Sequence, residues 1–416
     1  MKITKVIARE IYDSRGLPTV ECEIFLENGM RACAAVPSGK SKGSHEAVEL
    51  RDGGTRFFGL GVRKAIDNIE NKIGKILVGQ ELNAPHLDQL IIELDGTPNK
   101  AHLGANATLG VSMALYRAQA LVEQAELFEI IAWVCGNETV SLPMPLFNVI
   151  NGGAHADNNL RVQEFMIVPL GAQGFRQATE SSMVFYQVLK EIIKKKGKSV
   201  NVGDEGGFAP QFDDEIDALT CMLEAVIQLN NEEQVFAFAL DIAATQFYNP
   251  TTKLYDWHGD NVTSEDLVEY YAELTKHFPI FSIEDGLAED DWQGWMKLMQ
   301  ELGDKMQLVG DDLFATSPQR IKQGIELGAA NAVLIKPNQI GTITETLQVI
   351  KLCQESGLGT VISHRSGETC DSFIADLAVG TNAAQIKAGG CARSERVSKY
   401  NRLLVIEDIL MRSLLE

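Results

Sequence analysis

Six apolar segments in the second half of the chain each end in an ionisable residue. In order, these residues are Asp241, Glu284, Asp311, Lys336, the pair His364-Arg365, and Lys387. Successive positions are separated by 43, 27, 25, 28 and 23 residues, which is roughly one strand-plus-helix unit per step. In barrels built from such units, active sites lie at the carboxyl ends of the strands. The spacing therefore predicts that these charged groups meet at one mouth.

Asp241, Glu284 and Asp311 are three carboxylates at the ends of neighbouring predicted strands. Carboxylate oxygens that converge in this way suit Mg2+, which keeps waters and leaves coordination positions for a substrate. The alternative is a structural cluster in which the acids pair with Lys336 and Lys387. Because two lysines and an arginine facing three acids also describe a site for a metal and an anion, we interpret the pattern as such a site.

Lys336 follows the apolar run 333–335. Burial and neighbouring positive charges both lower the pKa of a lysine, so the sequence predicts a lowered pKa for Lys336. A neutral amine can act as a general base near neutral pH.

The segment 201–207 carries Asp204 and Glu205 among three glycines. Glycine allows positive φ and close backbone approach, so the segment indicates a shaped loop that presents a carboxylate, although a surface turn would have a similar sequence. Asp204 is expected to have a supporting role. Asp285 and Asp312, beside the proposed metal ligands, are expected to have supporting roles as well because adjacent strand residues face opposite sides.

The first third of the chain predicts a small α+β unit. Alternating apolar residues indicate strands over 3–11, 19–26 and near 30–36, joined as an antiparallel meander. Helical patterns follow to about residue 134, including one long segment over 105–134. A domain over 1–134 is expected, with a polar Gly/Ser loop at 37–44.

The remainder, 140–416, predicts a β/α barrel with an irregular beginning. Strands over 145–150 and 162–169 are expected to be antiparallel because the loop between them is too short for a parallel crossover. Helices over 173–196 and 214–229 follow. From residue 235, apolar runs begin near 235, 279, 306, 332, 360 and 383, with helical patterns such as 264–278, 317–328 and 342–357 after them. Six such units after a two-stranded start give eight strands.

Composition narrows the classes of partner. The chain has 416 residues and a formal net charge of −20, which disfavours binding to nucleic acid or anionic membranes. No 18-residue apolar run predicts a membrane span, and the N-terminus has no secretory signal pattern, so a cytoplasmic location is expected. The seven cysteines form no Cys-x-x-Cys pair and the seven histidines do not cluster, so a zinc site is not predicted and reduced thiols are expected.

Several sequence blocks together resemble those of the enolases, in the family's order, from about residue 3 to 410. The blocks are Asp13-Ser14-Arg15-Gly16, Gly203-Asp204-Glu205-Gly206-Gly207, Ser282-Ile283-Glu284-Asp285-Gly286, Gly310-Asp311-Asp312-Leu313, Leu334-Ile335-Lys336-Pro337-Asn338-Gln339 and Ser363-His364-Arg365-Ser366-Gly367-Glu368-Thr369. The resemblance implies an α/β fold, an irregular (β/α)8 barrel of ββαα(βα)6 type with a smaller N-terminal α+β domain. It also implies Mg2+-dependent, reversible dehydration of 2-phosphoglycerate to phosphoenolpyruvate, a phosphopyruvate hydratase activity.

The resemblance further implies residue roles. Lys336 would remove the proton next to the substrate carboxylate, and Glu205 would protonate the leaving 3-hydroxyl. Asp241, Glu284 and Asp311 would hold one Mg2+, and Ser41 would meet a second Mg2+. Arg365 and Ser366 would hold the phosphate and Lys387 the carboxylate. The residues expected to bind substrate are His155, Gln163, Glu164, His364, Arg365, Ser366 and Lys387. A homodimer or an octamer of dimers is also implied.

The chain departs from the family pattern in the mobile loop, where Lys40 and Lys42 flank Ser41. Like charges beside the serine are expected to weaken the second Mg2+ unless the lysines point outward or meet a more anionic substrate. One alternative is therefore an enolase-like lyase that acts on a different phosphorylated or phosphonylated hydroxy acid. Another is a non-catalytic protein with this fold that serves binding or structure. Other departures, such as Gln246 in place of a glutamate, are interpreted as drift.

Overall fold

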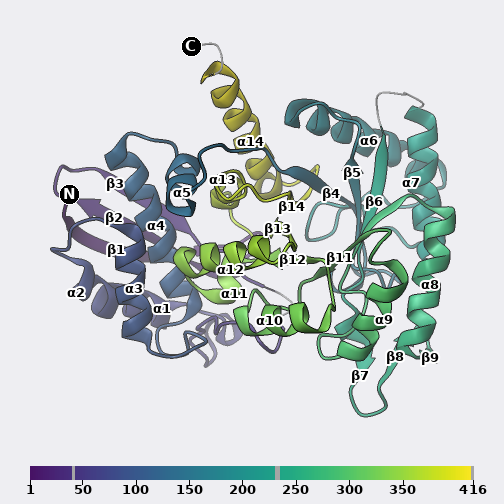
Figure 1. Ribbon diagram of the computed structural model, residues 1–416, viewed down its shortest axis with the longest axis horizontal. Helices are drawn as coiled ribbons and strands as arrows, with labels where there is room; N and C mark the ends of the chain where they lie inside the picture. The colour runs from purple at the N-terminus through teal and green to yellow at the C-terminus, as the bar shows by residue number, and fades with distance from the viewer. Residues whose placement is uncertain (40–42, 230–234, 414–416) are drawn as a thin grey trace.

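An antiparallel sheet begins the chain in the computed structural model, which describes residues 1–39, 43–229 and 235–413 (Figure 1). Its strands, in this order, are β1 (Ile3–Tyr12), β2 (Pro18–Leu26) and β3 (Arg31–Ala35). Val20, Cys22 and Ile24 alternate along β2 and are fully buried, because one face of the sheet packs on helices. The predicted meander is confirmed.

Helices follow the sheet, as predicted, but the long segment over 105–134 is not one helix. The chain turns at Gln124, whose φ of 54° is left-handed and ends the first of two helices. The helical elements of this region are η1 (Arg56–Gly59), α1 (Arg63–Asn68), η2 (Ile69–Ile73), α2 (Gly74–Leu77), α3 (Ala84–Asp95), α4 (Ala105–Glu123) and α5 (Leu127–Cys135).

A closed barrel forms the second part of the chain, and the predicted fold class is confirmed. Around the barrel its strands are β4 (Met144–Asn151), β5 (Glu164–Pro169), β6 (Phe236–Asp241), β10 (Ile280–Glu284), β11 (Gln307–Gly310), β12 (Ala332–Ile335), β13 (Gly359–Ser363) and β14 (Gln385–Gly390). The strand β5 is antiparallel to both β4 and β6, as expected from the short loop before it, and the other neighbours are parallel.

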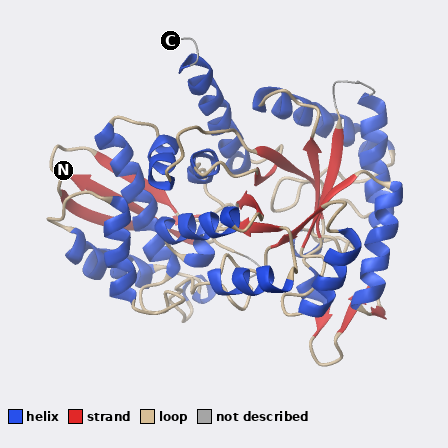
Figure 2. Ribbon diagram, in the orientation of Figure 1, coloured by secondary structure: helices blue, strands red, loops and turns tan. Residues whose placement is uncertain are grey.

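Helices surround the barrel strands (Figure 2). They are α6 (Phe175–Lys195), α7 (Glu215–Leu229), α8 (Ser264–His277), α9 (Trp292–Leu302), α10 (Pro318–Leu327), α11 (Pro337–Ile340), α12 (Ile343–Glu355), α13 (Phe373–Gly380) and α14 (Ser394–Ser413), with the short turns η3 (Gly153–His155) and η4 (Ala244–Phe247). A small antiparallel sheet of β7 (Tyr248–Asn249), β8 (Leu254–Trp257) and β9 (Asp260–Val262) lies between β6 and α8; this insertion was not predicted. The barrel interior is filled by apolar side chains such as Met166, Val309 and Leu334, so the barrel is a packed core and any site lies at its mouth.

Buried polar contacts join the N-terminal helices to α12. The ammonium of Lys100 donates to Glu345 Oε1 at 2.8 Å. The Oδ2 atom of Asp88 accepts hydrogen bonds from Ser112 Oγ at 2.7 Å and from Thr344 N and Oγ1 at 3.0 and 2.7 Å. These contacts hold the N-terminal unit against the barrel. None of the helices within the described ranges has the length and apolar character that a membrane crossing requires.

Candidate active site

Three carboxylates from adjacent strands share the ammonium group of Lys387 at the barrel mouth. Backbone register places Glu164 beside Asp241 and Asp241 beside Glu284 at the ends of β5, β6 and β10. Lys387 Nζ donates to Glu164 Oε1 and Asp241 Oδ2 at 3.1 Å each and to Glu284 Oε1 at 3.0 Å. Burial would lower the pKa of Lys387, but the three carboxylates raise it well above its ordinary value.

Lys336 and Asp311 form a second pair at the ends of β12 and β11. Lys336 Nζ donates to Asp311 Oδ2, and Gln339 Nε2 donates to Asp311 Oδ1 at 3.1 Å. The predicted lowering of the Lys336 pKa is wrong for this structure. Burial does lower it, but the carboxylates of Asp311 and Glu284 raise it, and the net pKa lies above the ordinary value. Burial acts to raise the pKa of Asp311, but Lys336, Lys387 and Arg365 together hold it below its ordinary value.

Glu205 is buried at the mouth, 2% exposed, so its loop is not a surface turn. The loop approaches its neighbours closely: a Cβ at Gly203 would lie 2.8 Å from the carbonyl oxygen of His155. Asn148 Nδ2 donates to Glu205 Oε2 at 3.2 Å, and His364 Nε2 lies 3.3 Å from the same oxygen. The predicted shaped loop therefore presents the Glu205 carboxylate to the cavity.

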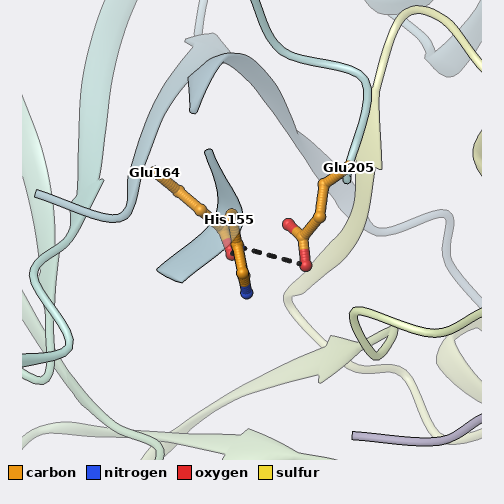
Figure 3. Close-up of side chains that lie close together, drawn as sticks. All are labelled: His155, Glu164 and Glu205. Carbon is orange, nitrogen blue, oxygen red and sulfur yellow. Dashed lines mark ion pairs between the residues drawn. The ribbon is translucent and has the colours of Figure 1, made fainter. Parts of the chain in front are cut away.

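His155 lies between two carboxylates, as Figure 3 shows. Its Nδ1 atom is 3.5 Å from Glu164 Oε1 and 3.5 Å from Glu205 Oε1. Burial and the negative charge of Glu205 raise the pKa of Glu164 well above its ordinary value. Burial also acts to raise the pKa of Glu205, but the neighbouring side chains of His155, His364 and Arg396 act in the opposite direction, and the net pKa lies well below its ordinary value. Of the two carboxyl groups, Glu164 therefore binds a proton more readily.

Arg365 and Ser366 lie on the side of the mouth that faces the N-terminal unit. The guanidinium of Arg365 donates to Glu46 Oε2 and Asn338 Oδ1 at 2.9 Å each. Arg15 Nη1 donates to Ser366 Oγ at 3.5 Å. Glu46 thus brings the end of the 37–44 loop segment to the mouth. Ser41, the predicted second metal ligand, lies outside the described residues together with its neighbours at 40 and 42.

Gln163 is held in place from two sides. Its Nε2 atom donates to Asp241 Oδ2 at 3.2 Å, and its Oε1 atom accepts a hydrogen bond from Gln246 Nε2 at 2.6 Å. Gln246, one of the departures from the family pattern, therefore orients a side chain of the site through a hydrogen bond.

These residues line one cavity. Its walls are His155, Gln163, Glu164, Glu205, Asp241, Asp311, Lys336, Ser363, His364, Arg365, Ser366 and Lys387. Glu284 joins them through Lys387. The structure thus brings together the predicted site residues that lie in its described part.

The donor set fits a hard cation. The mouth holds more carboxyl groups, Glu164, Glu205, Asp241, Glu284 and Asp311, than ammonium groups, Lys336 and Lys387. Burial and the nearby charge of Asp241 raise the pKa of Glu284 well above its ordinary value. A divalent cation bound by oxygen ligands would supply the missing positive charge.

Within the described ranges, two groups of acidic or histidine side chains are compact enough to hold a metal ion. One consists of His155, Glu164 and Glu205, and the other of Asp285, Asp311 and Asp312. The predicted trio of Asp241, Glu284 and Asp311 is not such a group in this part of the chain, since Lys387 and Lys336 contact its members. Asp285 accepts the backbone N–H groups of Asp311 and Asp312 at 2.9 and 2.7 Å, so it shapes the turn that carries Asp311.

Four residues of this arrangement were not predicted from the sequence as site residues: Asn148, Glu46, Gln339 and Arg396. Gln339 stands three residues after Lys336, a proximity that would have identified it. Arg396 lies near the start of α14, and an arginine is ordinarily exposed, yet it is fully buried. Its sequence context carries no signal of that burial.

Comparisons with known proteins agree with the fold. Residues 3–131 match the family model described as enolase, N-terminal domain, and residues 139–414 match that described as enolase, C-terminal TIM barrel domain. A curated protein of Corynebacterium kroppenstedtii named enolase is 49% identical over 411 residues, which cover 98% of this chain and 96% of that relative.

Proposed function

The chain belongs to the enolase family, and we propose that Lys336 and Glu205 are the base and the acid with which it dehydrates 2-phosphoglycerate to phosphoenolpyruvate. The activity is that of a hydro-lyase, phosphopyruvate hydratase. One observation carries the assignment of the two residues: both line the same buried cavity, each on a different segment of the barrel. A base and an acid that face one substrate from different sides suit an elimination.

Removal of the proton is the difficult step. The hydrogen next to a carboxylate is weakly acidic, because its loss places a second negative charge on that carboxylate. Positive groups arranged around the position where this charge develops lower the barrier. Lys387 is such a group, held rigidly by Glu164, Asp241 and Glu284.

A metal cofactor belongs to this family's chemistry, and we propose Mg2+, with two ions in each site. Asp241, Glu284 and Asp311 would hold one ion, and Ser41 would contribute to the second. When bound, Mg2+ supplies positive charge that stabilises the doubly charged carboxylate. Once Asp311 has another cation to pair with, it raises the pKa of Lys336 less, and burial then favours the neutral amine that a base requires.

Glu205 completes the elimination. Hydroxide is a poor leaving group, so the 3-hydroxyl must receive a proton as its bond to carbon breaks. Glu205 is buried and hydrogen-bonded by Asn148, which fixes its position. Because the pKa of Glu205 lies well below its ordinary value and that of Glu164 well above it, Glu205 must take up a proton from its surroundings, for example from the side of Glu164, before it can donate one. We propose that Arg365 and Ser366 bind the phosphate, with Glu46 as the partner of Arg365 that the phosphate displaces.

The substrate is a small phosphorylated hydroxy acid, and we propose that two copies of the chain form a homodimer, which can assemble further into an octamer. Exposed aromatic side chains support this: Phe58 is 95% exposed and Tyr12 is 59% exposed on the N-terminal unit. Large exposed apolar side chains often mark protein interfaces. We also propose a cytoplasmic location, because the seven cysteines are free thiols, as expected in a reducing compartment.

Formation of phosphoenolpyruvate from 2-phosphoglycerate, followed by ultraviolet absorbance, tests this function. Turnover is expected with Mg2+ and should be lost with a chelator. A folded protein that gives no turnover with Mg2+ would overturn the proposal and favour a different substrate or a binding role. Replacing Lys40 with alanine and Lys42 with threonine separates those cases, since a change of substrate preference would indicate that these lysines select the substrate.

A further inference from the structure

Arg396 lies behind the active site, fully buried at 0% exposed. Its guanidinium donates to His364 Nδ1 at 2.5 Å and to the carbonyl oxygens of Arg365, Ser366 and Asp204 at 2.6, 2.7 and 3.1 Å. One side chain near the start of α14 thus joins the segment after β13 to the loop that carries Glu205. A side chain that only filled space would not need this set of donors.

The contact with His364 determines which ring nitrogen carries the proton. A guanidinium has donors and no acceptor, so His364 Nδ1 must accept. The neutral imidazole then carries its hydrogen on Nε2. Burial lowers the pKa of His364 to about 3, so the neutral ring is the relevant form. Its Nε2 atom lies 3.3 Å from Glu205 Oε2, although the two atoms are not aligned for a hydrogen bond in this structure.

Two N–H groups therefore lie next to the same oxygen of Glu205: Asn148 Nδ2 donates a hydrogen bond to Oε2, and His364 Nε2 lies 3.3 Å from it. An oxygen that faces two N–H donors is a poor place for a third hydrogen. The other oxygen, Oε1, accepts no hydrogen bond within the described residues and lies 3.5 Å from His155 Nδ1. The arrangement selects Oε1 as the atom that holds the proton when Glu205 acts as an acid.

We propose that Arg396 is a positioning residue for the dehydration: it fixes His364 as the Nε2–H tautomer and so directs the transferable proton of Glu205 to Oε1. The inference rests on the proposed role of Glu205. In that step the Oε1–H bond breaks and the proton goes to the 3-hydroxyl of the substrate. The C3–O bond breaks and its electron pair leaves with the water that forms. The pair left on C2 after proton removal becomes the C2–C3 double bond, and Glu205 remains as a carboxylate.

The tautomer can be observed without substrate. Long-range ¹H–¹⁵N spectra of protein labelled with ¹⁵N-histidine, with the His364 signals assigned from a His364→Gln variant, should show a non-protonated Nδ1 and a protonated Nε2. Arg396→Lys should keep this pattern because an ammonium also only donates, whereas Arg396→Met should lose it. A protonated Nδ1 in the wild type, or an unchanged tautomer in Arg396→Met, overturns the proposal. If Arg396→Met does not fold, the spectra of the wild type and of Arg396→Lys still show whether His364 Nδ1 is non-protonated, as the proposal requires.

Arg393→Met is the matched control. Arg393 also reaches the loop of Glu205, through Gly203 O at 3.4 Å, and it contacts Ser14 O at 3.1 Å. None of its hydrogen bonds in the described structure goes to His364. The control should therefore keep the wild-type tautomer, and a changed tautomer in Arg393→Met would count against a specific role for Arg396.

Kinetics distinguish positioning from general damage. With 2-phosphoglycerate in D2O, Arg396→Met should form phosphoenolpyruvate about tenfold to a hundredfold more slowly, the range for weakened acid catalysis. Exchange of the C2 hydrogen with solvent, which needs only the base, should persist, and Arg396→Lys should recover much of the product rate. Equal loss of exchange and product formation overturns the proposal. Absence of turnover in the wild type would refute the proposed function instead, and the spectra would still test the tautomer.

Discussion

Lys336 donates a hydrogen bond to Asp311 across the carboxyl ends of the neighbouring strands β12 and β11. The proposed base and a proposed metal ligand therefore share one contact. Burial alone would lower the pKa of Lys336, and the negative charge of Asp311 is what raises it. The protonation of the base thus depends on what else the Asp311 carboxylate binds.

Asp311→Asn should lower the pKa of Lys336. The substitution removes the charge that raises this pKa and leaves the burial that lowers it, so the ammonium should lose its proton at lower pH. NMR titration of protein with ¹³C-labelled lysine, in chelator and with Lys336→Met for assignment, measures the change. Glu289→Gln, farther from Lys336 at the rim, should leave the titration as in the wild type. An unchanged or higher pKa in Asp311→Asn would contradict this account of the site.

Lys336→Ala and Glu205→Gln should each slow product formation by about 10²–10⁴-fold, the usual contribution of a positioned acid or base. The two variants should differ in one respect. Lys336→Ala should also lose exchange of the C2 hydrogen with D2O, whereas Glu205→Gln should retain it. Mg2+ binding, measured by calorimetry, should persist in both. Undiminished turnover in either variant would refute its assigned role.

The position of the site could be predicted from the sequence because the carboxyl ends of the barrel strands converge at one mouth, irrespective of the loops that follow them. Asp241, Glu284, Asp311 and Lys387 could be placed at one mouth from spacing alone. The direction of the Lys336 pKa could not be predicted, because it depends on the distance to Asp311 on another strand. In the same way, the break at Gln124 depends on the conformation of a single residue within a continuous apolar pattern.

Arg396 shows a further limit of sequence reasoning. Its role depends on carbonyl oxygens and an imidazole from segments about 30 and 190 residues away in the chain. Because every residue has a backbone carbonyl, the sequence does not show which carbonyls accept a hydrogen bond from Arg396. The β7–β9 insertion was missed because its strands are only two to four residues long, too short for an alternating pattern to stand out.

Mg2+ affinity should rise with pH. The pKa of Glu284 lies well above its ordinary value because of burial and the charge of Asp241, so protons compete with the metal for this carboxylate. Binding should then release protons, which calorimetry in buffers of different ionisation enthalpy can count. Glu284→Gln should weaken binding at least about tenfold, as loss of a metal-supporting group does, and should reduce the proton release. Binding that is independent of pH would contradict the assignment of Glu284.

Arg365→Lys should weaken the binding of inorganic phosphate and raise the KM for substrate. Arginine presents a planar fork that matches phosphate oxygens, whereas lysine offers a single ammonium. The guanidinium of Arg365 is buried and oriented by Glu46 and Asn338, so a lysine at this position cannot reproduce its paired hydrogen bonds to phosphate. Arg176→Lys, on the exposed side of α6, is a matched control that should change neither value. Equal phosphate affinity in Arg365→Lys and the wild type would argue against a phosphate site at Arg365.

Stability should fall as pH rises through about 6 because of Asp88. Burial raises the pKa of Asp88 to about 6, despite the hydrogen bonds from Ser112 and Thr344, against about 3.9 in an unfolded chain. The folded state therefore binds the proton more tightly, so this contribution reaches about 3 kcal/mol well below pH 4, is about 2 kcal/mol at pH 4 and is lost by pH 7. The unfolding midpoint of the wild type should fall relative to that of Asp88→Asn over this range, measured in chelator. Glu93→Gln, exposed on the same helix, is the control, and its unfolding midpoint should change with pH as that of the wild type does. Parallel pH profiles for the wild type and Asp88→Asn would show that Asp88 does not titrate in this way.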